Sequence, residues 1–432
     1  MPKPLMTPWS SRIFSRQNDQ ELIRDAVQRL RERRKDKPDA VQFDLLDDAK
    51  RKSVPVVTDQ LLIRTTDLDA DAERVLDSLG LKPEPVAGLD GKIQVITLPS
   101  GPPGQLKQAY DTLRAEKVKV SPDAIVPMGA DPAPDVVWKS LCTPEPVVSP
   151  FLARPEAPTP PKVRVVVLDT GITAEQRSDR WLLELAHPNG DNVDPLDIFP
   201  SPNGFLDLGA GHGTFVAGLI QRLAPAADIE VWRVLDSDGL TAESKVAAAM
   251  VAAASGGAQL INLSLGTETV DDEEPVALAV ALEMIREIEE RDGREIVVVA
   301  AAGNCGTETP VYPAAFDGVV SVAALTPTLK PAPWSSRGAW VKCSAVGENV
   351  VSTYVQGRED PFLRPGATEP LDPPDEYGPS SWALWSGTSF ATPQVTARIA
   401  QLAAEKGIGV RAATDQLLSG ARTDPDFGVF IT

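Results

Sequence analysis

The sequence predicts an α/β protein in which a large domain, with a parallel sheet covered by helices on both faces, follows a small α+β domain. Three observations support this prediction. The chain has 432 residues, more than one hydrophobic core usually serves. From residue 162 onward, apolar stretches such as VRVVVLD and EIVVVAA alternate with Ala-rich helical stretches, a pattern typical of a parallel sheet buried on both faces. Residues 55–130 instead have the order strand, helix, two strands, helix and strand.

These patterns divide the chain into four parts. We expect a helical extension over 1–54, a small α+β domain over 55–130, a linker over 131–161 and the large domain over 162–432. The segment 127–161 is rich in proline, which lacks a backbone donor, so it cannot run through the interior of a sheet. It is either a linker or an arm that lies on the surface.

An amphipathic helix is predicted over 21–34, where apolar residues recur at helical spacing among arginines. The apolar stripe consists of Leu22, Ile23, Ala26, Val27 and Leu30. Two interpretations stay open: the helix docks on a partner or a membrane surface, or it packs against its own protein.

Composition limits the classes of function. The net charge of -19 argues against nucleic acid as a partner, because phosphate is bound by clustered Lys and Arg. No stretch approaches the roughly 20 apolar residues of a membrane-spanning helix, and the first twenty residues lack the apolar core of a secretory signal. Three widely spaced cysteines form no C-x-x-C pair. We therefore expect a cytoplasmic protein without a membrane partner, metal site or cofactor.

Two motifs place polar side chains where a sheet domain builds its sites. VRVVVLDTGI is a buried strand that ends in Asp169, at the carboxyl edge of the sheet. GHGTFVAG presents His212 at the start of a helix, between two glycines. Taken alone, Asp169 could equally be an ordinary turn residue.

Two further motifs supply a hydroxyl and an amide. In SGTSFATP, Ser389 opens a helix, where negative charge is favoured, although serine is also a common helix cap. In VVVAAAGN, a buried strand ends in Asn304, whose side-chain amide could donate to an oxyanion.

In the order Asp, His, Asn, Ser, these four motifs resemble the subtilisin-like serine protease family, over residue 162 to the end. The resemblance implies a subtilisin-like parallel sheet and a serine endopeptidase that works through an acyl-enzyme. Asp169, His212 and Ser389 would be its catalytic triad and Asn304 its oxyanion donor. Protein or peptide substrates would be its partners.

The resemblance also implies a substrate site. An extended peptide would pair with the backbone of Ser264, Leu265 and Gly266. The pocket for the side chain before the scissile bond would be formed by Ala301, Ala302, Gly303 and Val311. Since family members often have glycine at the position of Val311, we expect small or medium residues to be preferred there.

The small domain resembles the ferredoxin-like propeptide of subtilisins, which implies a zymogen that processes itself and is gated by its own N-terminal domain. The expected processing site lies within 126–134, where the last strand ends. The alternative is a regulatory domain that is never cut.

Two other segments carry polar residues without a clear role. Asp191, Asn192, Asp194 and Asp197 match no calcium-loop spacing, so we expect a solvated acidic turn. The acidic, Pro-rich segment 355–385 could rim the cleft or be a surface insertion.

Two readings from other classes compete with the endopeptidase. One is a protease-like peptide-binding or sensor module, against which the intact triad argues. The other is a nucleotide-binding enzyme, for which neither G-x-G-x-x-G after a first strand nor a P-loop lysine is present.

Overall fold

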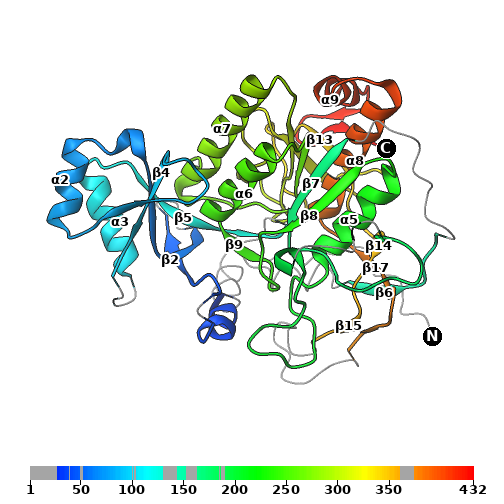
Figure 1. The fold of residues 1–432 in the computed structure, drawn as a ribbon, viewed down its shortest axis with the longest axis horizontal. Coiled ribbons are helices and arrows are strands. Elements are labelled where there is room, and N and C mark those ends of the chain that lie inside the picture. The colour runs from blue at the N-terminus through cyan, green and yellow to red at the C-terminus, as the bar shows by residue number, and fades with distance from the viewer. Residues whose placement is uncertain are drawn as a thin grey trace.

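The computed structural model of the chain describes residues 27–37, 39–48, 52–99, 101, 104–129, 144–151, 163–183, 185, 190–360 and 374–432. They form a small N-terminal unit (27–129) beside a larger C-terminal unit (163–432) (Figure 1). Strand β5 (Val120–Pro127) runs from the N-terminal unit to the C-terminal unit and pairs there with β9 (Leu240–Ala242). The two units therefore share one sheet.

The C-terminal unit is built on an eight-stranded sheet in the order β18-β19-β13-β12-β11-β10-β7-β8, in which only β18 and β19 pair antiparallel. The strands are β7 (Arg164–Asp169), β8 (Asp228–Arg233), β10 (Leu260–Leu263), β11 (Val297–Ala301), β12 (Val320–Leu325), β13 (Cys343–Val346), β18 (Thr423–Asp424) and β19 (Gly428–Phe430). The central strands are buried along their whole length, which explains their continuous apolar sequences. The predicted parallel α/β fold is confirmed.

Two helix layers cover this sheet. Helices α6 (Glu243–Ser255) and α7 (Val276–Asp292) pack on each other, and α5 (His212–Leu223) packs on α8 (Thr388–Lys406), which also contacts α9 (Val410–Leu418). Both layers contact the central strands, and their apolar side chains form one continuous core with them. The carboxyl ends of β7 and β11 lead directly into two of the predicted site residues.

The N-terminal unit has one antiparallel sheet with the strand order β3-β4-β2-β5, to which β1 adds at β2. Its elements are a helix over the described residues 27–34, β1 (Phe43–Asp47), β2 (Ser53–Arg64), η1 (Thr65–Asp67), α2 (Ala70–Ser78), β3 (Pro83–Pro85), β4 (Ile93–Thr97), α3 (Gln105–Ala115) and β5. The sequence did not predict β1, because its acidic sequence FDLLD lacks the β-branched residues typical of strands.

Part of the Pro-rich segment lies on the C-terminal unit. Strand β6 (Glu145–Val147) pairs with β17 (Trp382–Trp385), which also pairs with β14 (Val350–Thr353). Phe151 then packs 5.4 Å from the ring of Trp382. For residues 144–151, this contact supports the surface arm over the free linker. The remaining elements are η2 (Gly190–Asn192), η3 (Val270–Asp272), β15 (Gly357–Arg358) and β16 (Glu376–Tyr377).

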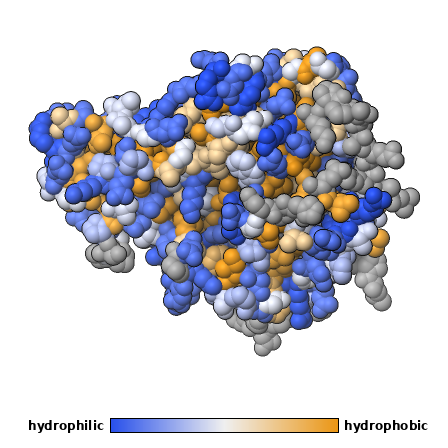
Figure 2. Space-filling model, in the orientation of Figure 1, coloured by the Kyte–Doolittle hydropathy of each residue, from blue (hydrophilic) through white to orange (hydrophobic). Residues whose placement is uncertain are grey.

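Charge is complementary across the contact between the units. In four exposed or half-buried ion pairs, the N-terminal unit supplies the cation and the C-terminal unit the carboxylate. These pairs are Arg64–Glu283 (3.0 Å), Lys92–Glu287 (2.6 Å), Arg114–Glu273 (2.7 Å) and Lys52–Glu268 (2.8 Å). Hydrophilic side chains cover much of the visible face of the N-terminal unit (Figure 2).

None of the helices among the described residues is both long and apolar enough to cross a bilayer.

Candidate active site

The carboxylate at the end of β7 faces the imidazole at the start of α5. His212 Nδ1 lies 2.7 Å from Asp169 Oδ1, and that oxygen also accepts the N–H of Thr170 at 2.7 Å. The two segments touch through their backbones, since a Cβ on Gly213 would lie 2.1 Å from the carbonyl oxygen of Gly171. The small residues of both motifs therefore let Asp169 and His212 approach each other.

Ser389 lies in the first turn of α8. Its hydroxyl donates to the carbonyl oxygen of Ser264 at 3.2 Å, and the Ser264 hydroxyl donates to the Ser389 carbonyl at 2.8 Å. These reciprocal bonds attach the predicted nucleophile to the segment that follows β10. The positive end of the α8 dipole favours negative charge at this position.

Asn304 follows β11 and is oriented by the residue before Ser389. Its Oδ1 accepts hydrogen bonds from the backbone N–H and the hydroxyl of Thr388, both at 2.9 Å. Because Oδ1 is occupied in this way, the amide nitrogen Nδ2 is left to act as a donor on the side of Ser389. The structure thus places Asp169 against His212, and Asn304 against the residue that precedes Ser389.

Aromatic side chains surround the imidazole. The rings of Trp385 and Phe390 lie 5.6 Å and 5.3 Å from that of His212, and the Tyr354 hydroxyl donates to the carbonyl of Ala210 at 2.9 Å. Trp385 belongs to the segment 355–385, whose residues 361–373 lie outside the described residues. At least this end of the segment therefore forms part of the active-site wall.

Asp194 joins the segments that carry Asp169 and His212. Its Oδ2 accepts the N–H of Gly211 at 2.8 Å and the hydroxyl of Thr170 at 3.0 Å. The side chain is buried, and burial raises the pKa of Asp194 to about 6. The expected solvated turn is wrong for Asp194. This side chain points inward, to Thr170 and Gly211, and no local sequence pattern signals that direction.

The rest of that acidic segment is more open. Asp191 is exposed, whereas Asn192 and Asp197 are half-buried, and Asp197 accepts backbone N–H groups from Asn203 and Gly204. In the part of the chain that the structure describes, no group of three or more His, Cys, Asp or Glu residues is placed to hold a metal ion.

The end of the N-terminal unit lies in the cleft beside Ser389. Gly129 N–H donates to the carbonyl of Ser264 at 3.0 Å, and Gly266 N–H donates to that of Pro127 at 3.1 Å. Met128, between them, forms an antiparallel bridge with Leu265. We call residues 127–129 the tail. The predicted pairing segment 264–266 is thus occupied by the chain's own backbone.

The opposite side of the cleft also holds the tail. Met128 N–H donates to the carbonyl of Gly239 at 2.9 Å, just before β9. The Met128 side chain is buried against Gly209 and Gly239, where an added Cβ would lie 3.1 Å and 2.6 Å from its sulfur. The tail therefore runs as a middle strand between two edges of the C-terminal unit.

Comparison with known proteins agrees with this geometry. A sequence profile of the subtilase family matches residues 161–423. The chain belongs to the subtilase family. This is a family of serine endopeptidases. The thermophilic serine proteinase of Bacillus sp. (strain AK1) is 30% identical over 283 residues, which cover 61% of this chain and 59% of that protein. Thermitase of Thermoactinomyces vulgaris is 30% identical over 276 residues, covering 60% of this chain and 83% of thermitase.

A solved structure is similar over more of the subtilase chain. Fervidolysin from Fervidobacterium pennivorans, described as a keratinolytic enzyme related to subtilisin, covers 87% of this chain at a TM-score of 0.57 and 21% identity. The alignment spans 60% of fervidolysin. At this identity the likeness shows the fold alone.

The residues predicted to form the pocket of this subtilase are buried, and one of them is hydrogen-bonded to the residue before Ser389. Ala301, Ala302 and Val311 are fully buried. Gly303 N–H donates to the Thr388 hydroxyl at 3.1 Å, so Gly303 is tied to the residue before Ser389. Pocket formation by these side chains stays a prediction.

A pair of carboxyl groups lies where the two units of the subtilase meet. Asp123 of β5 accepts the N–H and the hydroxyl of Ser244, while Glu243, the first residue of α6, accepts the N–H of Ala277 at 2.7 Å and that of Ala124 at 3.4 Å. Both side chains are buried, and burial raises the pKa of each. The sequence does not predict this pair, because no local pattern signals a contact between units.

Proposed function

We propose that the chain is a serine endopeptidase that cuts its own backbone after Gly129 and is then held inactive by its N-terminal unit. The position of the tail carries this proposal. A Cβ on Gly129 would lie 3.3 Å from Ser389 Oγ and 2.7 Å from Asn304 Nδ2. Gly129 thus lies beside the predicted nucleophile, and for this reason we propose the peptide bond that follows it as the scissile bond.

The chemistry follows from the arrangement of the side chains. A neutral serine hydroxyl is a poor nucleophile, so His212 would take its proton while Ser389 Oγ bonds to the carbonyl carbon of Gly129. Asp169 would accept the Nδ1–H and stabilise the imidazolium. The Ser389 N–H and Asn304 Nδ2 would donate to the oxyanion.

Collapse of the tetrahedral intermediate would break the bond between Gly129 and Ala130. His212 would return its proton to the leaving amine, and Gly129 would remain as an ester on Ser389. A water molecule, deprotonated by His212, would then hydrolyse the ester, which leaves a carboxylate on Gly129 and restores the hydroxyl.

Side-chain preference is constrained at two positions of the tail. Gly129 has a φ of +66°, and a Cβ there would press on the Asn304 amide, so we propose small residues before the scissile bond. Met128 fills the space over Gly239, so a long unbranched side chain fits the preceding position. Substrates in trans would be proteins or peptides that bind in the place of the tail.

The test compares the purified wild type with Ser389→Ala by intact mass spectrometry. The wild type should yield two fragments divided after Gly129, whereas Ser389→Ala should stay intact. Ser386→Ala is a matched control, since Ser386 lies three residues before Ser389 and its hydroxyl accepts the N–H of Asn349. An intact wild type, or equal cleavage of Ser389→Ala, would refute self-processing.

The competing peptide-binding or sensor module is tested separately. A fluorophosphonate probe should label the wild type on Ser389, most strongly once the N-terminal unit has been removed. Lack of Ser389-dependent labelling would favour the binding module.

A further inference from the structure

Two arginines at the end of the N-terminal helix are buried in the C-terminal unit. The side chain of Arg34 has no exposed surface and that of Arg33 is 14% exposed. The apolar residues Val27 and Leu30 of the same helix pack in a cluster with Val57 of β2. The helix therefore packs against its own protein through its apolar side chains. The contacts of its two arginines are additional to this apolar packing.

Arg33 contacts three carboxylates of the C-terminal unit. Its guanidinium lies 3.0 Å from Asp207, 3.1 Å from Asp238 and 3.7 Å from Asp360, and it donates to the carbonyl of Phe199 at 3.0 Å. Five donors in a fixed plane allow one arginine to serve several acceptors in this way.

Arg34 shares Asp238 with Arg33 and contacts a fourth carboxylate, that of Asp236. It pairs with Asp236, lies 3.3 Å from Asp238 and stacks 4.6 Å from the ring centre of Phe199. Burial lowers the pKa of Arg34 to about 10, so the side chain remains a cation at neutral pH. We call Asp207, Asp236, Asp238 and Asp360 the acidic recess.

Three of these carboxylates also hold the loops that form the cleft. Asp207 accepts the N–H groups of Ile198 and Phe199, and Asp238 accepts that of Leu208 at 3.4 Å. Asp236 accepts the N–H of Leu240 at 3.1 Å.

These loops lead directly to the active site. The segment 207–211 precedes His212, and the segment 236–239 carries the carbonyl that binds the Met128 N–H. The two segments are joined by a hydrogen bond of 2.7 Å from Gly209 N–H to the carbonyl of Ser237. The arginines and the tail therefore contact the same edge of the cleft, the arginines through its aspartates and the tail through the carbonyl of Gly239.

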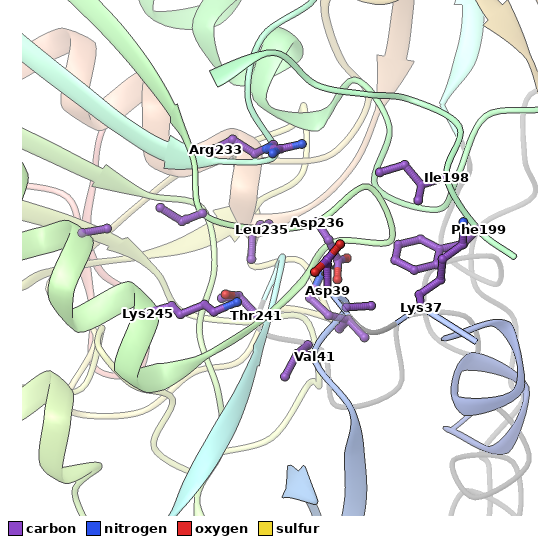
Figure 3. Close-up of a pocket in the computed structure, with 14 residues that line it drawn as sticks. Lys37, Asp39, Val41, Ile198, Phe199, Arg233, Leu235, Asp236, Thr241 and Lys245 are labelled. Atoms are coloured by element: carbon purple, nitrogen blue, oxygen red, sulfur yellow. Dashed lines mark hydrogen bonds between the residues drawn. The ribbon is translucent and has the colours of Figure 1, made fainter. Parts of the chain in front are cut away.

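A hollow lies between the units just after the helix. It has a volume of about 630 Å³ and is lined by Lys37, Asp39 and Val41 of the N-terminal unit and by Phe199 and Asp236 of the C-terminal unit (Figure 3). The contact between the units at this end is therefore made by the arginines, which lie more than 90 residues before the tail in sequence.

We infer that the acidic recess is a docking site for Arg33 and Arg34, which holds the N-terminal unit on the enzyme after the bond following Gly129 has been cut. The inference rests on the proposed self-processing. Hydrolysis frees the end of the tail but changes nothing at the recess. Because both contacts belong to one folded unit, the recess keeps the tail at high effective concentration in the cleft.

The test uses the full chain carrying Arg33→Gln and Arg34→Gln together, with Arg31→Gln as the matched control. Arg31 is on the same helix, but its partner, Asp44 at 3.1 Å, belongs to the N-terminal unit itself. After self-cleavage, the wild-type and Arg31→Gln fragments should elute as one complex in size-exclusion chromatography. The double variant should separate with a Kd raised about a hundredfold or more, since buried ion pairs are lost.

Peptide hydrolysis gives an independent measurement, because docking loss should raise activity whereas misfolding would lower it. The double variant should hydrolyse an added peptide sooner and faster than the wild type after cleavage. Asp236→Asn, which keeps an acceptor for Leu240, should have the same effect from the other side of the contact. Unchanged Kd and unchanged lag in both variants would overturn the inference.

The uncut chain separates this inference from the proposed function. In the Ser389→Ala background, the double variant should increase amide hydrogen exchange at 236–240 at least tenfold, and Arg31→Gln should not. Unchanged exchange would overturn the docking site even if self-cleavage occurs. An uncut wild type with increased exchange in the double variant would refute self-processing and leave the contact supported.

Discussion

The substitution Gly239→Ala tests whether the side chain of Met128 fixes the tail in the cleft. A Cβ at this position would lie 2.6 Å from the sulfur of Met128, 2.7 Å from its Cγ and 2.8 Å from its Cε. Gly239 also has a φ of +78°, which an L side chain rarely adopts. The variant should therefore displace Met128 from its buried position.

Two costs arise in this variant. The left-handed backbone costs about 1–2 kcal/mol of folding stability in alanine, whether or not the tail is docked, and overpacking against Met128 costs about 1–3 kcal/mol only when the tail is docked. The second cost corresponds to weakening of tail docking by about fivefold to 150-fold. Met128→Ala removes the clash, so the double variant should regain about 1–3 kcal/mol relative to additivity.

Hydrogen exchange of the Met128 amide measures this docking in the uncut Ser389→Ala background. Gly257→Ala serves as the control, because Gly257 has a φ of +94° but its Cβ would meet nothing closer than 3.5 Å. Gly257→Ala should leave the Met128 amide protected. Strict additivity of Gly239→Ala and Met128→Ala would refute the role of the methionine side chain.

Three further predictions concern the site and the contact between units. Asn304→Ala should slow self-cleavage about 10²–10³-fold, the loss known for such a donor in a subtilisin, as measured by the first-order rate of fragment formation; a smaller loss than tenfold would contradict its role. Asp194→Ala should lower Tm and slow cleavage, because two buried donors lose their acceptor at about 1–3 kcal/mol each, whereas Asp197→Ala should do so much less. Burial raises the pKa of Asp123 and Glu243, so the docked state binds more protons than the separated units. Docking should therefore weaken as pH rises from the ordinary carboxyl range through the raised values, and Asp123→Asn should flatten this dependence in Kd measurements; a Kd that falls with rising pH would contradict the sign.

The proposed triad residues could be located from the sequence because each lies at a local signal. A continuous apolar strand ends at Asp169, and helices begin at His212 and at Thr388, the residue before Ser389. In a parallel sheet such ends lie at one edge, and the resemblance to subtilisin-like proteases assigned the roles. The segment 264–266, which follows the apolar strand β10, was also predicted from this resemblance.

Contacts between distant segments could not be predicted. Arg33 and Asp238 are 205 positions apart and carry charges that a surface would also accept. Asp194 lies in a polar segment whose composition is that of an exposed turn. In both cases the burial of the side chain depends on how loops fold over the sheet. Neither hydrophobic periodicity nor helix-capping residues predict that folding. The proposed cleavage after Gly129, within the expected region 126–134, likewise depends on the position of Gly129 beside Ser389, which no sequence pattern gives.

The sheet that passes from the N-terminal unit through β5 to β9 would, under the proposed function, restrict which proteins can be cut. A substrate that replaces residues 125–129, the part of the chain that pairs with β9 and with the segment 264–266, must itself become a strand over about 16 Å at 3.3 Å per residue. Few native proteins present such a length of free backbone, because their strands and helices already use it. Cleavage of a folded target should then be limited by how often that target opens locally. The enzyme would thus distinguish damaged or incompletely folded chains from intact ones before any side chain is recognised.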